Sequence, residues 1–283
     1  MTSDASDPRS AVWWRLSAED LEREYSPSSM VPALEPFLAA YAGRSSAARA
    51  EVVHERLVFG DHPDEWLWYV PPPEPGGPLH VFVHGGYWRR LSADDGTFPA
   101  VAFRAAGCGF ASLNYSLAPA TPLRAITDQA RRALSFLCGP GLAHDPARVY
   151  GSGHSAGAQL LAIALLDAPL AGASFVSGIF DLEPVSRIRA DEPLGLAGDD
   201  LVTLSPLRNV PITEAPAVVA WAERDTDEFR RQSLQWAAAW GDAGNRPPVA
   251  FEVPDRNHFD VVFDLGDPGT LLGRAVLGQM ESV

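Results

Sequence analysis

The chain contains no lysine: all 22 of its basic residues are arginine. Lysine is required for Schiff-base chemistry, for the phosphate-binding P-loop and for hydrolases that use its amine as a general base. These three kinds of active site are therefore excluded. The 36 acidic residues bring the formal net charge to −14. Because nucleic acids and anionic membrane surfaces are bound through basic faces, we expect neither as a partner.

Cysteine and long apolar runs are also scarce. Cys108 and Cys138 form no metal or redox spacing, so we expect free thiols in a reducing compartment. No apolar run approaches the roughly 18 residues of a membrane span. The polar first residues, MTSDASDPRS, do not have the pattern of a secretory signal. These features predict a cytoplasmic protein, with the oligomeric state left open and a homodimer among the options.

What the chain does have is an alternation of strand-like and helix-like segments. We expect strands at 51–60, 65–70, 79–85, 109–115, 148–153, 173–178, 215–222 and 248–253, and helices at 97–107, 123–139, 156–168, 233–244 and 270–280. Two short helices are expected within 17–42, broken at Ser26-Pro27, with Ser17 as the N-cap. The Pro-rich stretch 71–78 is predicted to be a loop rather than a domain linker. This order favours one α/β domain, with a mostly parallel sheet covered on both faces.

The segment Gly153-His154-Ser155-Ala156-Gly157 has the form G-x-S-x-G between a predicted strand and a predicted helix. In that setting the serine sits on a strained turn that raises its hydroxyl above the sheet, and the glycines allow close packing around it. The helix that follows begins at the site and can stabilise an oxyanion. The neighbouring Ser152 does not fit the frame, because Tyr150 and His154 flank it. We therefore predict that Ser155 is a nucleophile.

A serine nucleophile needs a general base, usually a histidine oriented by a carboxylate. Hydrolases with this elbow place the residues in the order Ser, acid, His along the chain. Of the seven histidines, only His258 follows Ser155 with room for an acid between them. A surface histidine beside Asp260 is the alternative, but the order favours His258 as the base.

The acid should follow a strand between Ser155 and His258. Candidates after the strand that ends near Ala222 are Glu223, Asp225, Asp227 and Glu228, and Asp181 follows an earlier strand. Asp225 leads on its position in the loop, and position alone does not decide among them.

The segment His84-Gly85-Gly86-Tyr87-Trp88 follows the third major strand, where such hydrolases place the backbone donors of the oxyanion hole. Two glycines let a substrate carbonyl come within about 3 Å of backbone N–H groups. We expect donors at Gly85, Gly86 and Tyr87, with Ala156 beyond the nucleophile. His84 is expected to brace the loop. Tyr87 and Trp88 are predicted to bind substrate, with packing in the core as the alternative.

With these residues placed, the chain resembles the kynurenine formamidase (arylformamidase) branch of the α/β-hydrolase superfamily. The matching segments occur in order over about 20–260, and "HGGYW" and "SGIFDLEP" are the more specific. They are "EREYSPS", "HGGYW", "NYSLAP", "GHSAGAQL", "SGIFDLEPV", "LSP", "DTDEFRRQS" and "NHFD". The resemblance implies the α/β-hydrolase fold, Ser155 as nucleophile, His258 as base and Asp225 as the acid. It also implies that no metal or other cofactor takes part.

Two segments depart from the family pattern. Ser116 stands where such families usually carry Arg, and Ala158-Gln159 stands where Gly-His is common. Neither touches the expected triad. We also expect 1–50 (a tail and cap helices) and 181–212 to cap the site within a single domain, 1–283.

The expected activity is metal-independent serine hydrolysis of an N-formyl aryl amide. The best substrate is N-formyl-L-kynurenine, and the reaction would serve tryptophan breakdown or secondary metabolism. A carboxylesterase with the same triad is the alternative. A hydrolase fold kept only for binding would be marked by a lost triad residue, and all three are present.

Overall fold

The computed structural model describes residues 13–188 and 194–281. They contain an eight-stranded sheet in the order β1-β2-β4-β3-β5-β6-β7-β8. β2 is antiparallel to both of its neighbours, and all pairings from β4 to β8 are parallel. The strands are β1 (Glu55–Val58), β2 (Trp66–Val70), β3 (Leu79–Val83), β4 (Gly109–Leu113), β5 (Val149–His154), β6 (Gly172–Val176), β7 (Ala217–Arg224) and β8 (Val249–Asn257).

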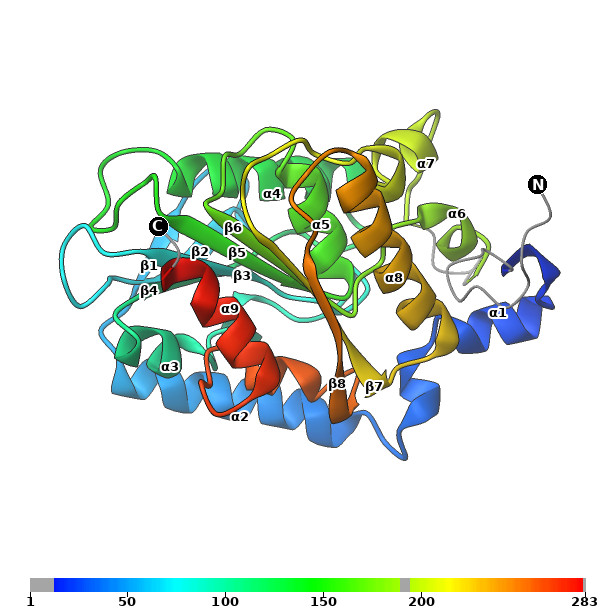
Figure 1. Ribbon diagram of the computed structural model, residues 1–283, viewed down its shortest axis with the longest axis horizontal. Coiled ribbons are helices and arrows are strands. Elements are labelled where there is room, and N and C mark those ends of the chain that lie inside the picture. Colours follow the sequence, from blue (N-terminus) through cyan, green and yellow to red (C-terminus); the bar gives the residue numbers. More distant parts are fainter. Residues whose placement is uncertain (1–12, 189–193, 282–283) are drawn as a thin grey trace.

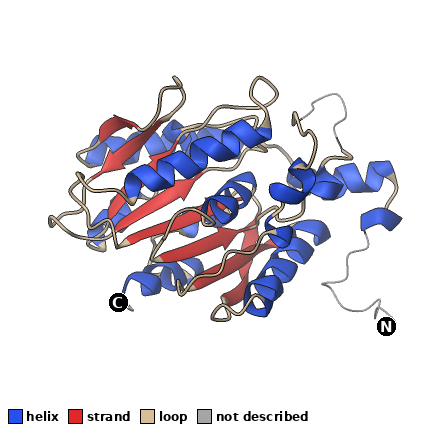
Figure 2. Ribbon diagram, turned by 90° about the horizontal axis from the view of Figure 1, so that it is seen from above, coloured by secondary structure: helices blue, strands red, loops and turns tan. Residues whose placement is uncertain are grey.

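Helices cover both faces of this sheet (Figures 1 and 2). On one face α4 (Leu123–Leu137), α5 (Ala156–Ala164) and α8 (Asp227–Asp242) share a core with the strands. On the other face a second core holds residues of α2 (Glu35–Glu51), α3 (Ala100–Ala105) and α9 (Leu271–Glu281). β3 is buried along its whole length, as expected of a strand covered on both sides. This is the expected α/β-hydrolase fold.

The expected N-cap is confirmed: α1 (Ala18–Glu24) begins after Ser17, whose side chain accepts a hydrogen bond from the Asp20 amide. The segment 71–78 is a loop between β2 and β3, as predicted. The remaining short helices are α6 (Leu182–Val185), α7 (Asp200–Thr203), η1 (Trp13–Arg15), η2 (Pro27–Met30), η3 (Ala93–Asp95), η4 (Pro206–Arg208) and η5 (Val261–Asp264).

Several predicted boundaries are wrong. The second of the two short helices expected within 17–42 is α2, which continues to Glu51, and α5 ends at Ala164 rather than at 168. The expected strand 51–60 starts late, because the Ala and Arg residues at 47–50 favour helix and α2 continues to Glu51. The helix expected at 233–244 already begins at Asp227, where two acidic residues in the first turn complement the helix dipole. α6 and α7 were not predicted, since four residues are too few to show a helical period. Across 13–188 and 194–281, no helix is both long and apolar enough to cross a membrane.

Candidate active site

Ser155 lies on the turn between β5 and α5, with a left-handed φ of 53°. A non-glycine residue in this region is strained, and such strain persists where the surrounding structure enforces it. The flanking glycines show why. A Cβ on Gly153 would lie 2.5 Å from the Gly157 carbonyl oxygen, and one on Gly157 would lie 2.1 Å from the Val83 oxygen. Only glycine fits at either position.

Ser152 has a different environment. It lies inside β5, is completely buried, and its Oγ is 2.7 Å from Nε2 of His80. The His80 ring stacks on Phe103 with a centroid distance of 4.1 Å, and burial lowers the pKa of His80 to about 3. This neutral Ser–His pair belongs to the core. Neither side chain lines the cavity that contains Ser155.

Asp225 and His258 come together at the ends of β7 and β8. Nδ1 of His258 is 2.7 Å from Oδ1 of Asp225, and both side chains are buried. Since an ionised carboxylate only accepts hydrogen bonds, Nδ1 carries the proton, and Nε2 is the ring nitrogen that can accept one.

The other candidate acids have other partners. Asp181 caps α6, Glu223 accepts a hydrogen bond from the Asp255 amide, and Glu228 pairs with Arg231. Asp227 is exposed. Among these five carboxylates, Asp225 is the one that contacts His258.

Ser177 is a further polar contact of this site that the sequence did not predict. Its Oγ donates to Oδ2 of Asp225 at 2.6 Å, and the Ala222 amide donates to the same oxygen at 2.9 Å. Ser177 is completely buried at the end of β6 and has a left-handed φ of 47°. Ser177 is the first residue of "SGIFDLEP". The sequence therefore indicated the motif, but it did not predict the hydrogen bond to Asp225.

His154 was also missed, although it belongs to the G-x-S-x-G segment. Burial, with His258 nearby, lowers its pKa well below the ordinary value, so the ring is neutral. Its Nε2 is 2.8 Å from the His258 carbonyl oxygen, a geometry in which Nε2–H donates. His154 therefore connects the turn that carries Ser155 to the loop that carries His258.

The backbone of segment 84–88 passes close to Ser155. A Cβ on Gly85 would lie 3.1 Å from the Ser155 Cβ, and one on Gly86 would lie 2.4 Å from the Arg90 carbonyl oxygen. Gly86 has a φ of 95°, and Tyr87 and Trp88 also have left-handed values of 59° and 56°. Gly85, Gly86 and Tyr87 line the cavity with Ser155. Ala156 begins α5, so its N–H has no acceptor within the helix.

Trp88 is not where we expected it. Its side chain is completely buried and absent from the cavity lining, and its indole Nε1 donates to Oε1 of Gln159 at 3.0 Å. The substrate-binding assignment of Trp88 is therefore corrected to a core position. A left-handed backbone at two successive residues turns the indole inward, and no local pattern indicates this. Tyr87 lies in the cavity wall as expected.

His84 lies in the cavity lining and contacts Tyr115. Its ring stacks on Tyr115 with centroids 4.2 Å apart, and the Tyr115 hydroxyl donates to the His84 carbonyl oxygen at 2.8 Å. Burial lowers the pKa of His84 to about 4, so the ring is neutral. These contacts agree with the expected bracing role.

Gln159 and Ser116, which depart from the family pattern, both make hydrogen bonds within the fold. Gln159 is completely buried; it accepts from Trp88 and donates to the Leu204 carbonyl oxygen at 2.9 Å. It therefore joins the 84–88 loop to the "LSP" segment. Ser116 donates to Asp64 at 2.8 Å and its amide donates to Gln129 at 2.7 Å.

A cavity of about 160 Å³ contains Ser155 and His258 in its lining. Its apolar wall consists of Leu34, Leu38, Phe82, Leu91, Phe98, Phe259 and Val262. Ser26, Pro27, Ser28 and Tyr41 also contribute, so part of the expected 1–50 cap forms a wall. The described residues of 181–212 are not in the lining, and 189–193 lie outside the described residues.

Within 13–188 and 194–281, His, Cys, Asp and Glu side chains form no group of three or more that could hold a metal ion.

Curated proteins are similar in sequence to this chain over most of their length. Kynurenine formamidase of Danio rerio is 32% identical, with 94% of this chain and 97% of the relative covered. The chain belongs to the kynurenine formamidase family. The Salmo salar enzyme is 29% identical over 95% of this chain and 98% of its own. Residues 80–206 match a family model described as the alpha/beta hydrolase fold.

Solved structures agree on the fold. A candidate thioesterase from Silicibacter sp. has a TM-score of 0.79 at 22% identity, covering 91% of this chain and 98% of its own. A thermostable carboxylesterase from a metagenomic library has a TM-score of 0.66 at 18% identity, covering 95% and 98%.

Proposed function

We propose that this protein hydrolyses the N-formyl bond of an aryl formamide, and that N-formyl-L-kynurenine is its substrate, giving L-kynurenine and formate. The observation that carries the proposal is the hydrogen bond between His258 and Asp225 at a cavity lined by Ser155. Membership in the kynurenine formamidase family supports the choice of a formamide.

In the proposed mechanism, Oγ of Ser155 attacks the formyl carbon while Nε2 of His258 takes the hydroxyl proton. Asp225 holds the Nδ1–H tautomer and stabilises the imidazolium that forms. The N–H groups of Gly85, Gly86, Tyr87 and Ala156 bind the oxyanion, a task for which the close approach of the loop to Ser155 is suited.

The tetrahedral intermediate then loses its amine. The C–N bond breaks as His258 returns the proton to nitrogen, which leaves a formyl ester on Ser155. Water attacks this ester with His258 again acting as base, and formate departs. Two moderate barriers replace one high barrier, as in other covalent mechanisms.

The residues that line the cavity favour an aryl substrate that carries a carboxylate. Phe82, Phe98 and Phe259 provide apolar surface for a ring. Arg89 and Arg90 also line the cavity, and Arg90 is exposed. In a protein of net charge −14, two adjacent arginines at the site favour the approach of an anionic substrate.

We also propose that the reaction belongs to tryptophan breakdown, as the proposed substrate implies, and that it takes place in the cytoplasm. Carboxylesterase activity is the competing proposal, since the same triad cleaves esters.

The deciding experiment compares steady-state hydrolysis of N-formyl-L-kynurenine and p-nitrophenyl acetate. We expect kcat/KM for the formamide to exceed roughly 10⁴ M⁻¹ s⁻¹, an ordinary enzyme value, and to exceed that for the ester. Cleavage of the ester alone would replace the formamidase with a carboxylesterase.

A further inference from the structure

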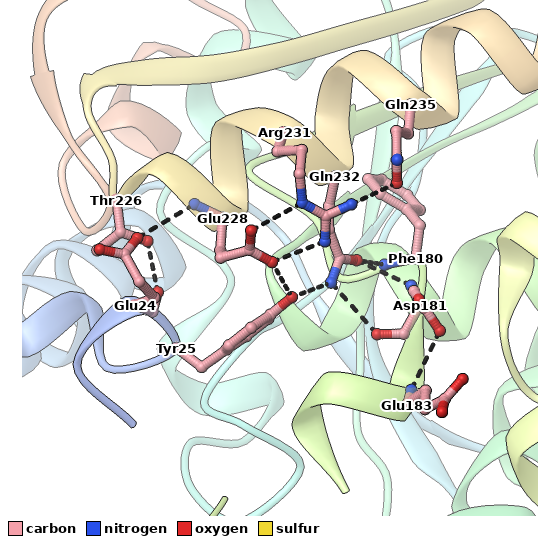
Figure 3. A network of polar contacts seen from close by, with 10 residues as sticks. All are labelled: Glu24, Tyr25, Phe180, Asp181, Glu183, Thr226, Glu228, Arg231, Gln232 and Gln235. Carbon is pink, nitrogen blue, oxygen red and sulfur yellow. Dashed lines mark hydrogen bonds and ion pairs between the residues drawn. The ribbon is translucent and has the colours of Figure 1, made fainter. Parts of the chain in front are cut away.

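Ser26, Pro27 and Ser28 form one wall of the cavity and follow directly after Tyr25 in the chain. Figure 3 shows the polar contacts of Tyr25 with the body of the protein. Tyr25 ends α1 and is completely buried. Its hydroxyl donates to Oε2 of Glu228 at 2.7 Å and accepts from Nε2 of Gln232 at 2.6 Å. Both partners lie on α8, more than 200 positions along the chain.

These partners are themselves fixed. Arg231 donates to both carboxylate oxygens of Glu228, at 2.8 and 2.6 Å, and the pair is buried. Gln232 accepts from the amides of Phe180 and Asp181 at the start of the segment that carries α6. Because buried polar groups are costly to leave unpaired, this network has one well-defined arrangement.

The backbone beside Tyr25 is also bound to α8. The Thr226 hydroxyl donates to the Glu24 carbonyl oxygen, and the Glu228 amide donates to the Glu24 carboxylate at 3.3 Å. The end of α1 therefore rests on the N-terminus of α8, directly after Asp225.

An aromatic contact links the same place to the base. Phe229 packs against Tyr25 with ring centroids 6.0 Å apart, and against His258 in an edge-on contact at 4.5 Å. Tyr25 therefore precedes the residues that form the cavity wall, and it also contacts Phe229, which packs against His258.

We propose that Tyr25 is a positioning residue that holds residues 26–28 of the cavity wall against α8. These residues contact the leaving group of the substrate. Tyr25 then determines how well a bulky aromatic leaving group is bound, and has little effect on the chemistry at Ser155. The inference rests on the proposed function only in that Ser155 cleaves acyl compounds.

The test uses Tyr25→Phe, which keeps the ring and removes the hydroxyl, with phenyl acetate and methyl acetate as substrates. The two esters share an acyl group and differ in leaving group. Each variant is compared with wild type on the same ester, so the difference in intrinsic reactivity cancels. We expect KM for phenyl acetate to rise about fivefold, as the loss of a net hydrogen bond allows. We expect kcat for phenyl acetate, and both constants for methyl acetate, to stay within about twofold.

Tyr69→Phe is the matched control. Tyr69 is equally buried and its hydroxyl is hydrogen-bonded to His144 at 3.1 Å, but its chain neighbours Trp68 and Val70 do not line the cavity. Both esters should respond as in wild type. A Tyr25→Phe variant that loses activity on both esters in parallel, or on neither, would overturn the proposal.

Hydrogen exchange gives a readout that needs no substrate. Amides of 26–38 should exchange faster in Tyr25→Phe, while those of α4 keep their wild-type protection. Unchanged exchange in 26–38 contradicts the proposal. Should Tyr25→Phe fail to fold, Gln232→Met removes the other bond to Tyr25 and carries the same expectations. Inability to cleave N-formyl-L-kynurenine would refute the proposed function and leave the ester and exchange tests intact.

Discussion

The Ser177 hydroxyl donates a 2.6 Å hydrogen bond to Oδ2 of Asp225, while Oδ1 of the same carboxylate contacts His258 at 2.7 Å. The carboxylate is therefore fixed from both sides. A hydrogen bond to a charged group contributes more than one between neutral groups, so the orientation of His258 depends on Ser177.

Replacing Ser177 with Ala should lower kcat roughly tenfold with KM close to wild type, because the lost bond to a charged group loosens Asp225 and not the cavity wall. Steady-state kinetics on N-formyl-L-kynurenine measures this. Ser174→Ala is the matched control, since Ser174 lies on β6 three positions before Ser177, is equally buried and is hydrogen-bonded to Gln279 at 2.9 Å. Equal kcat losses in the two variants would mean that the effect is general destabilisation.

Asp225→Asn should lower kcat by on the order of 10³- to 10⁴-fold, because an amide in this place favours the wrong tautomer of His258. Asp227→Asn, two positions along and exposed, should retain activity within about twofold. Circular dichroism checks that both variants fold. Retained activity in Asp225→Asn would return the role of the acid to the other carboxylates of the region.

Arg90→Gln should raise KM for N-formyl-L-kynurenine about threefold at low salt, an effect that shrinks as salt screens the charge. Formanilide has no carboxylate, and its KM should not change. Arg246→Gln removes an exposed arginine away from the cavity and controls for net charge. A similar rise in KM for both formamides would contradict carboxylate recognition by Arg90.

His80 makes stability depend on pH. Its pKa of about 3 in the folded state lies below the ordinary 6.5, so the unfolded chain binds a proton that the native protein does not. The contribution is fully present above pH 6.5 and is lost as the pH falls toward 3, by about 1.4 kcal/mol per pH unit for one proton.

His80→Gln should therefore reduce the slope of unfolding free energy against pH between 6 and 4, as measured by urea unfolding. Parallel curves for His80→Gln and wild type would show that His80 does not titrate on unfolding.

Much of the site could be predicted because its signals are local. Gly153, Ser155 and Gly157 share one turn, and the order of residues along the chain singles out His258. Parallel strands bring their carboxyl ends to one edge of the sheet, so residues that follow them meet there.

The contacts that were missed join distant segments. Ser177 lies 48 positions from Asp225, His154 lies 104 from His258, and Tyr25 lies 203 from Glu228. Spacing along one segment contains no information about such pairs. Trp88 was misplaced for a related reason: its indole is hydrogen-bonded in the core to Gln159, which lies 71 positions along the chain.

The central claim is that Ser155 is the nucleophile of a formamidase, and formate release from N-formyl-L-kynurenine by Ser155→Ala and Ser152→Ala tests it most directly. Each variant loses one serine hydroxyl, and the two serines are three positions apart. Ser152, however, is hydrogen-bonded to His80 in the core. We predict that Ser155→Ala abolishes formate release, while Ser152→Ala is less stable by about 1 kcal/mol and remains active. Formate release that survives in Ser155→Ala would contradict the account.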